Sequence, residues 1–174
     1  FIQGNHLTDR RIRHIKVLLP HGSLTNLHKT TFFGCANANG PVERDQSNGG
    51  GDPNDGSPLT INNVRYSCGL GVSDRAFVEI ALSQDEFTFT CLVGIDDETP
   101  NTSAQIHISV DGKPLLQKDI ESKEPLDISL PNLCGEILRL ETRQNSDREA
   151  HIDWVNPQLI RSAHTHHITP QERN

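Results

Sequence analysis

The sequence predicts an all-β fold, an antiparallel β-sandwich of the jelly-roll type. Short segments that alternate apolar and polar residues follow one another at intervals of roughly 8–15 residues, with turn-forming residues between them. No window of ten or more residues carries the apolar stripe that an amphipathic helix needs. Eight or nine short strands arranged in this way are typical of a sandwich or a barrel, and the jelly-roll sandwich is the expected form.

The first third of the chain predicts few strands and one long loop. Residues 13–19 (RHIKVLL) are expected to form the first strand, which Pro20 and Gly22 end. Most of residues 34–58 are Gly, Pro, Asn, Asp or Ser, and structureless loops of this length are uncommon unless they are functional or disordered. Residues 59–64 (LTINNV) then resume the strand pattern.

The remaining residues predict an unbroken series of strands. The sequence Asp111-Gly112 predicts a hairpin, because both central residues of its tight turn must reach positive φ. It joins the segments 105–110 and 114–120, and the other expected strands are 76–82, 87–94, 126–130, 136–142 and 151–155.

The 174 residues are sufficient for one domain of ordinary size. We expect an N-terminal extension over residues 1–12, the sandwich over 13–160 and a polar tail over 161–174. The tail carries His164, His166 and His167, which we interpret as part of a disordered end rather than a metal site.

Composition argues against several functional classes. The net charge of −7 disfavours phosphate backbones and anionic lipid surfaces, and no run approaches the roughly 18–20 apolar residues of a bilayer span. We therefore expect neither a nucleic-acid partner nor a membrane partner. The sequence motifs of serine hydrolases, zinc proteases and nucleotide-binding enzymes are absent, which favours a protein that is not an enzyme.

Four cysteines occur at spacings that match no zinc finger or haem motif. Their even number is compatible with two disulfides in any of three pairings, and free thiols remain an equal alternative. Cys91 shares a strand face with Phe87 and Phe89, as expected of a buried free thiol. The other three cysteines are Cys35, Cys68 and Cys134.

Acidic residues in the long loop suggest a structural calcium ion. Calcium takes six to eight oxygen ligands and can stiffen an irregular loop. No EF-hand register fits the DPNDG segment, so the candidate ligands rest on composition alone; they are Asp45, Asp52 and Asp55.

Five segments, in order, resemble the NPCBM group, also called carbohydrate-binding module family 51. They are GPVERDQSNGG (40–50), GSPLTINNVRYSCGLGVSDRAFVEIAL (56–82), FTFTCLVGIDDE (87–98), SAQIHISVDGKPL (103–115) and HIDWVNPQLI (151–160). The resemblance covers roughly residues 15 to 160. It implies a galactose-binding-like β-sandwich without catalytic activity, which agrees with the fold that periodicity predicts.

The resemblance also implies a function and a site. Members of the group are usually secreted or on the cell surface, are often linked to a catalytic domain that cleaves glycosides, and in some cases recognise galactose-containing glycans. We therefore expect a glycan ligand here, bound by hydrogen bonds and limited stacking. The candidate carbohydrate-binding residues are Asn37, Asn39, Glu43, Arg44, Asp153 and Trp154.

Two departures from the group's pattern keep alternatives open. Ala38-Asn39 stands where many members have an aromatic residue, and Ser73 stands where they have a histidine after GLGV. Only 5% of the chain is aromatic, which leaves little stacking capacity. One alternative is a protein-interaction or structural module that has lost the sugar site, and another is a glycosidase or lyase with two facing carboxylates.

Individual residues have competing interpretations as well. Trp154 would form either a sugar-facing wall or a plug in the core, and the core is the commoner place for a lone tryptophan in a strand. The triplet Glu43-Arg44-Asp45 would either contact sugar hydroxyls and calcium or pin the long loop to the sandwich.

Overall fold

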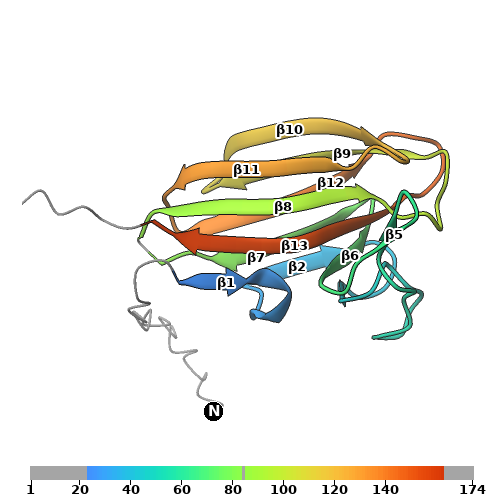
Figure 1. Cartoon of the computed structure of the whole chain (residues 1–174), viewed down its shortest axis with the longest axis horizontal. Helices are drawn as coiled ribbons and strands as arrows, with labels where there is room; N and C mark the ends of the chain where they lie inside the picture. The colour runs from blue at the N-terminus through green and yellow to red at the C-terminus, as the bar shows by residue number, and fades with distance from the viewer. Residues whose placement is uncertain (1–22, 84, 163–174) are drawn as a thin grey trace, which may run out of the picture.

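Two antiparallel sheets pack face to face in the structure, a computed structural model that describes residues 23–83 and 85–162 (Figure 1). This confirms the predicted antiparallel β-sandwich. The expected strand at 13–19, the N-terminal extension and all but the first two residues of the expected tail lie outside the described residues.

The first sheet has six strands and is organised around the longest one, β13 (His151–Arg161). One edge of β13 pairs with β8 along most of its length, while the other pairs with β6 through His151–Val155 and with β1 through Gln158–Ile160. The remaining members are β1 (Leu24–Asn26), β3 (Glu43–Arg44), β6 (Gly69–Ser73), β8 (Phe87–Ile95) and β11 (Leu126–Leu133).

The second sheet runs in the order β10-β9-β12-β7-β2. Its strands are β2 (Gly34–Asn37), β7 (Ala76–Ala81), β9 (Ser103–Val110), β10 (Lys113–Glu121) and β12 (Ile137–Gln144). Asp111 and Gly112 have φ values of 49° and 75°, so the predicted tight turn joins β9 to β10. The carboxylate of Asp111 also accepts the amide hydrogens of Glu136 and Ile137, which ties this turn to the start of β12.

The core lies between the sheets and follows the alternation seen in the sequence. Every second residue of β9 is buried, and Ile106 and Ile108 have no exposed surface. Phe89 from β8 and Trp154 from β13 are among the largest fully buried side chains and belong to the same cluster. Burial of side chains of this size stabilises the fold by roughly 1.5–3 kcal/mol each.

The structure corrects the secondary structure predicted from the sequence for the region before β7. Residues 59–64 do not form one strand: Asn62 and Asn63 adopt φ values of 51° and 62° and make the turn of a small hairpin, β4 (Thr60–Ile61) and β5 (Val64–Arg65). The predicted loop contains β2 and β3. The buried strand β6 was not predicted, because all five of its residues are buried and its sequence does not alternate.

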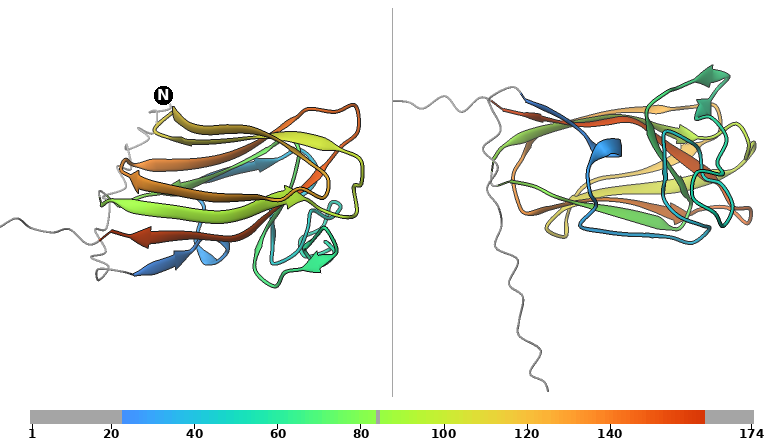
Figure 2. Two further views of the ribbon diagram at one scale, coloured as in Figure 1. Left: turned by 45° about the horizontal axis from the view of Figure 1, so that its top comes forward. Right: turned by 90° about the horizontal axis from the view of Figure 1, so that it is seen from below.

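The segments between β3 and β6 gather at one end of the sandwich, together with the β4–β5 hairpin (Figures 1 and 2). A 3₁₀ turn, η1 (Leu27–Lys29), follows β1 and packs against β13 and β6. Among the described residues, no helix is long and apolar enough to cross a bilayer.

Candidate functional site

The loop end of the sandwich holds a groove of about 510 Å³. Its position is fixed by backbone hydrogen bonds: the amide of Ser47 donates to the carbonyl of Ser57 at 2.8 Å, and that of Tyr66 donates to Leu59 at 2.9 Å. The groove is lined by Asp45, Gln46, Gly56, Pro58, Arg65, Tyr66 and Ser67.

Aromatic and charged side chains meet in this groove. Tyr66 is half-buried, Arg65 is exposed, and the Asp45 side chain is 46% exposed. Within the described residues, no protein group hydrogen-bonds to the Tyr66 hydroxyl. A single aromatic face beside polar groups suits a ligand that is apolar on one side and carries hydroxyls at its edge.

Glu43 holds the loop rather than facing solvent. Its side chain is 2% exposed, and its two carboxylate oxygens lie 3.2 and 3.0 Å from the backbone nitrogen of Asn54, which donates to them. Strand β3 fixes Glu43 by pairing it with Gly71 of β6. The structure therefore gives Glu43 the loop-pinning role, one of the two alternatives expected for this triplet.

Arg44 is likewise committed to protein contacts. Its guanidinium donates hydrogen bonds to the carbonyls of His28 and Thr30, the latter at 2.8 Å, and lies 4.1 Å from the centroid of the Phe32 ring. These contacts attach the segment after η1 to β3. Two hydrogen bonds to carbonyls and the contact with a ring hold the plane of the Arg44 guanidinium in place on the protein itself.

Asn37 is used in the same way. Its amide nitrogen donates to the carbonyls of Asn39 and Pro41 and to the side chain of Asn48, while its oxygen accepts from the amide of Ser73 at 2.8 Å. The structure brings Asn37 and Asn39 together, but through the Asn39 carbonyl and as a support for the loop.

Asp153 and Trp154 are buried, with 0% and 1% of their surface exposed. Of the two roles expected of Trp154, the structure shows the plug in the core rather than the sugar-facing wall, because its side chain packs in the buried cluster between the sheets. Neither residue reaches a glycan at the surface.

The Asp153 carboxyl faces that of Asp96 and the hydroxyl of Ser47 beneath the loop. Burial raises the pKa of Asp153 well above its usual range, the hydrogen bond with Asp96 and the Asp96 charge raise it further, and Ser47 and the amide of Thr60 oppose the shift. The buried Asp153 carboxyl therefore favours its protonated form more strongly than an exposed aspartate does.

The three expected calcium ligands do not come together. The Asp55 carboxylate accepts amide hydrogens from Gly50 at 2.8 Å and from Asp52 at 3.2 Å, as a cap of the loop's own turn. Asp45 lies instead beside His28 and Cys68, and these three residues form the one group of three or more potential metal ligands among the described residues. Asp45, Asp52 and Asp55 as a set do not offer the clustered oxygens that calcium needs.

All four cysteines are free. Cys91 is buried, as expected, and burial raises the pKa of its thiol well above its usual range, with the nearby Asp127 carboxylate adding to the shift. Cys35 and Cys134 are exposed and Cys68 is half-buried.

The structure thus assembles a groove whose main residues were not among the expected site residues. The sequence signals were present but weak: Tyr66 is the chain's one tyrosine, and Arg65 precedes it. Nothing in their spacing indicates that they lie beside Asp45, because that proximity depends on the fold-back of the loop onto β6.

Comparisons with known proteins agree on one type of domain. The sequence profile of the NPCBM/NEW2 domain matches residues 24–160. A Renibacterium salmoninarum protein named for endo-alpha-N-acetylgalactosaminidase activity is 28% identical over 141 residues, which cover 78% of this chain and 9% of that protein. The chain therefore spans only a small part of this relative's length.

Two solved structures share the fold. A CBM51 module of Clostridium perfringens GH95, solved in complex with methyl-galactose, has a TM-score of 0.66 and 17% identity, with 79% of this chain and 99% of that chain covered. The CBM51-2 module of C. perfringens ZmpB, solved with GlcNAc, also has a TM-score of 0.66, with 16% identity and coverage of 80% and 32%.

Proposed function

Because this chain belongs to the NPCBM/NEW2 domain family, with the fold of carbohydrate-binding modules, we propose that it is a non-catalytic module that binds galactose-containing glycans in the groove beside Tyr66. The observation that carries the proposal is the meeting of an aromatic side chain with the charged side chains of Arg65 and Asp45 at the loop end of the sandwich.

The chemistry of the groove fits a sugar. The ring of Tyr66 offers a platform for the apolar face of a pyranose, and its hydroxyl has no protein partner among the described residues. Arg65 donates hydrogen bonds and the Asp45 carboxylate accepts them, so hydroxyls at the rim of the sugar find both kinds of partner. A site with one aromatic residue and an open groove would bind weakly, with specificity set by the hydroxyl pattern.

The choice of galactose rests on relatives. One structural neighbour was solved with methyl-galactose and another with GlcNAc, and a relative in sequence is named for an enzyme that acts on N-acetylgalactosamine linkages. As an accessory module, the chain would belong to a secreted or cell-surface protein and would be covalently linked to a catalytic domain, consistent with the small share of the relative that it spans.

The burial of the Asp96–Asp153 carboxyl pair argues against glycoside hydrolysis at this pair. Asp96 and Asp153 are 1% and 0% exposed and both accept the hydrogen of the Thr60 amide, so a glycan at the surface does not reach them. Catalysis would belong to another part of a longer protein.

Calorimetric titration with methyl-galactoside and, separately, with GlcNAc tests the proposal. We expect saturable binding of the galactoside, and a loss of roughly 5–30-fold in affinity for Tyr66→Ala and for Arg65→Ala, which corresponds to about 1–2 kcal/mol. Lys118→Ala, at an exposed position on β10, is the matched control and should bind as wild type.

The result that would overturn the proposal is also clear. If neither sugar binds, or if Tyr66→Ala binds as tightly as wild type, the groove is not a galactose site. A failure with every sugar would favour the alternative of a structural or protein-interaction module, in which the loop contacts of Asn37, Glu43 and Arg44 persist for stability alone.

A further inference from the structure

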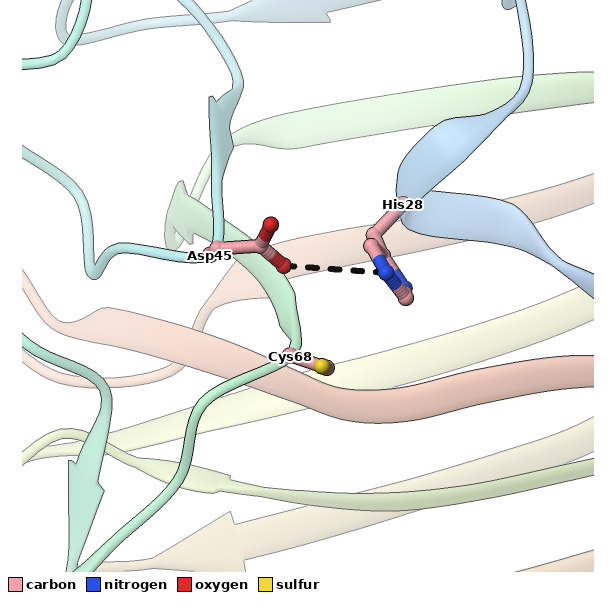
Figure 3. A group of neighbouring side chains, drawn as sticks. All are labelled: His28, Asp45 and Cys68. Atoms are coloured by element: carbon pink, nitrogen blue, oxygen red, sulfur yellow. Dashed lines mark ion pairs between the residues drawn. The ribbon is translucent and has the colours of Figure 1, made fainter.

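Three potential metal ligands from distant parts of the chain meet at one point next to the groove (Figure 3). His28 belongs to η1, Asp45 directly follows β3, and Cys68 directly precedes β6. Their ligand atoms all lie within 4.8 Å of one another, and Nε2 of His28 is 3.8 Å from Oδ1 of Asp45.

The state of His28 is a second, independent observation. Its side chain is 3% exposed, and neither ring nitrogen has a hydrogen-bond partner. Buried polar atoms are nearly always hydrogen-bonded, because leaving one unpaired costs roughly 1–3 kcal/mol. A buried imidazole whose nitrogens make no hydrogen bond, beside a thiol and a carboxylate, is available to bind a metal ion.

The backbone around the three residues is fixed, so the cluster is preorganised. The guanidinium of Arg44 donates to the His28 carbonyl, and the Gly69 amide donates to Oδ1 of Asp45 at 3.1 Å. The carbonyl of Cys68 accepts from the amide of Asn156 at 2.9 Å. The side chains need only small rotations, not a change of fold, to converge.

We propose that His28, Asp45 and Cys68 form a site for a thiophilic divalent cation, zinc in the first instance, with water as the fourth ligand. Zinc accepts an imidazole nitrogen, a thiolate and a carboxylate oxygen in tetrahedral geometry, with bonds of about 2.0–2.3 Å. Such bonds place neighbouring ligand atoms about 3.3–3.8 Å apart, close to the 3.8 Å between His28 and Asp45. Calcium takes oxygen ligands and has no use for the thiol or the ring nitrogen.

The site would lock three elements together without depending on glycan binding. It connects η1, β3 and β6 at the edge of the groove, and Asp45 is shared with the groove lining. Tyr66 and Arg65 are not among its ligands, so the two proposals can fail separately.

The test is a zinc titration of the full chain under reducing conditions, in competition with a chromophoric chelator. We expect one equivalent of zinc bound, and a loss of affinity in Cys68→Ser and in Asp45→Asn that exceeds the roughly 10–100-fold cost of losing an outer-shell partner. Cobalt in place of zinc should give a thiolate-to-metal charge-transfer band that disappears in Cys68→Ser. Zinc should also slow alkylation of Cys68 in the unaltered protein, a measurement that needs no variant.

Three controls make the result specific. Cys134→Ser and Cys35→Ser remove exposed thiols outside the cluster and should leave zinc binding and the cobalt band unchanged. The triple substitution of His164, His166 and His167 by Gln removes a competing histidine cluster and should do the same. Tyr66→Ala should retain zinc binding while its affinity for the galactoside falls.

Either of two outcomes would overturn the proposal. One is zinc binding that survives Cys68→Ser with the cobalt band intact. The other is the absence of stoichiometric zinc binding in the folded wild-type chain, or its replacement by calcium binding that Cys68→Ser does not alter.

Discussion

Asp96 and Asp153 present carboxylate oxygens to the same backbone amide, that of Thr60, at 2.9 and 3.2 Å. The two acids lie beneath the loop, where burial, followed by the hydrogen bond with Asp96 and the Asp96 charge, raises the pKa of Asp153. The Asp153 oxygen that accepts from Thr60 is Oδ2, and Oδ1 has no hydrogen-bond partner among the described residues. The pair ties the β4–β5 hairpin to β13 in a way that depends on protonation.

The first prediction concerns pH and Asp153. Because the folded-state pKa is raised above the ordinary value of 3.8, the folded state binds the proton more tightly than the unfolded state does. The stability contribution of Asp153 is therefore fully present below pH 3.8 and is lost as pH rises through the folded-state pKa. Asp153→Asn should remove this dependence and be more stable than wild type at pH 8 by on the order of 1 kcal/mol or more. Urea denaturation of wild type and Asp153→Asn between pH 4 and pH 8 measures this difference in the free energy of unfolding.

The control for this measurement is Asp147→Asn, at an exposed position in the loop before β13. It should follow the wild-type stability curve at every pH. A wild type that gains stability, relative to Asp153→Asn, as pH rises from 4 to 8 would contradict the prediction.

A second prediction assigns Arg44 to stability. Arg44→Ala removes two hydrogen bonds to carbonyls and the contact with the Phe32 ring, and should lower the free energy of unfolding by roughly 2–3 kcal/mol. Arg44→Lys should recover only part of this, because an ammonium group lacks the planar fork. Equilibrium denaturation gives the value. If Arg44→Ala kept wild-type stability but lost glycan affinity, Arg44 would be a glycan-binding residue and the prediction would be wrong.

A third prediction concerns Gly71, at the centre of β6. A Cβ atom built there would lie 2.3 Å from the Gln46 carbonyl oxygen and 2.4 Å from the Ser47 carbonyl carbon, and both of these atoms belong to backbone. Gly71→Ala should therefore push the loop off β6 and destabilise the fold by about 3 kcal/mol. Gly51→Ala, where nothing lies within 4 Å, is the matched control and should have little effect. Thermal denaturation of Gly71→Ala and Gly51→Ala measures the difference. Equal midpoint temperatures for the two variants would contradict the close contact between Gly71 and the loop.

A fourth prediction ranks the thiols. Cys35 and Cys134 are exposed and should react readily with a thiol reagent, and Cys68 should react more slowly. Cys91 should react only after unfolding, because burial, and then the charge of Asp127, disfavours its thiolate. Mass spectrometry of protein alkylated for increasing times, with and without urea, gives the order. Early labelling of Cys91 in native protein would contradict it.

The order of the strands from β7 onward could be predicted because their signal is local. Strands such as β7 and β9 alternate apolar and polar residues, so the face that must be buried is evident from a few neighbouring positions. The Asp111-Gly112 turn is equally local. The family resemblance extended this prediction to the architecture, which the NPCBM/NEW2 match confirms.

The site could not be predicted to the same degree. Polar residues of the loop were expected to face a sugar, yet Asn37, Glu43 and Arg44 make hydrogen bonds to other parts of the protein, mostly to backbone groups 2–36 positions away. The sequence shows that these residues have hydrogen-bond donors and acceptors. It does not show which groups become their partners, because that depends on how the loop folds. Burial decides between a ligand and an internal contact, and burial is a property of the folded chain.

By itself, the sequence determined the sandwich, the β9–β10 hairpin and the burial of Cys91, because periodicity and turn chemistry act over a few residues. Only the tertiary structure decided that Trp154 fills the core, that Tyr66, Arg65 and Asp45 share a groove, and that His28, Asp45 and Cys68 converge. The physical reason is that these relationships depend on long-range pairing of β3 with β6 and of β6 with β13, through which residues distant in the chain become neighbours.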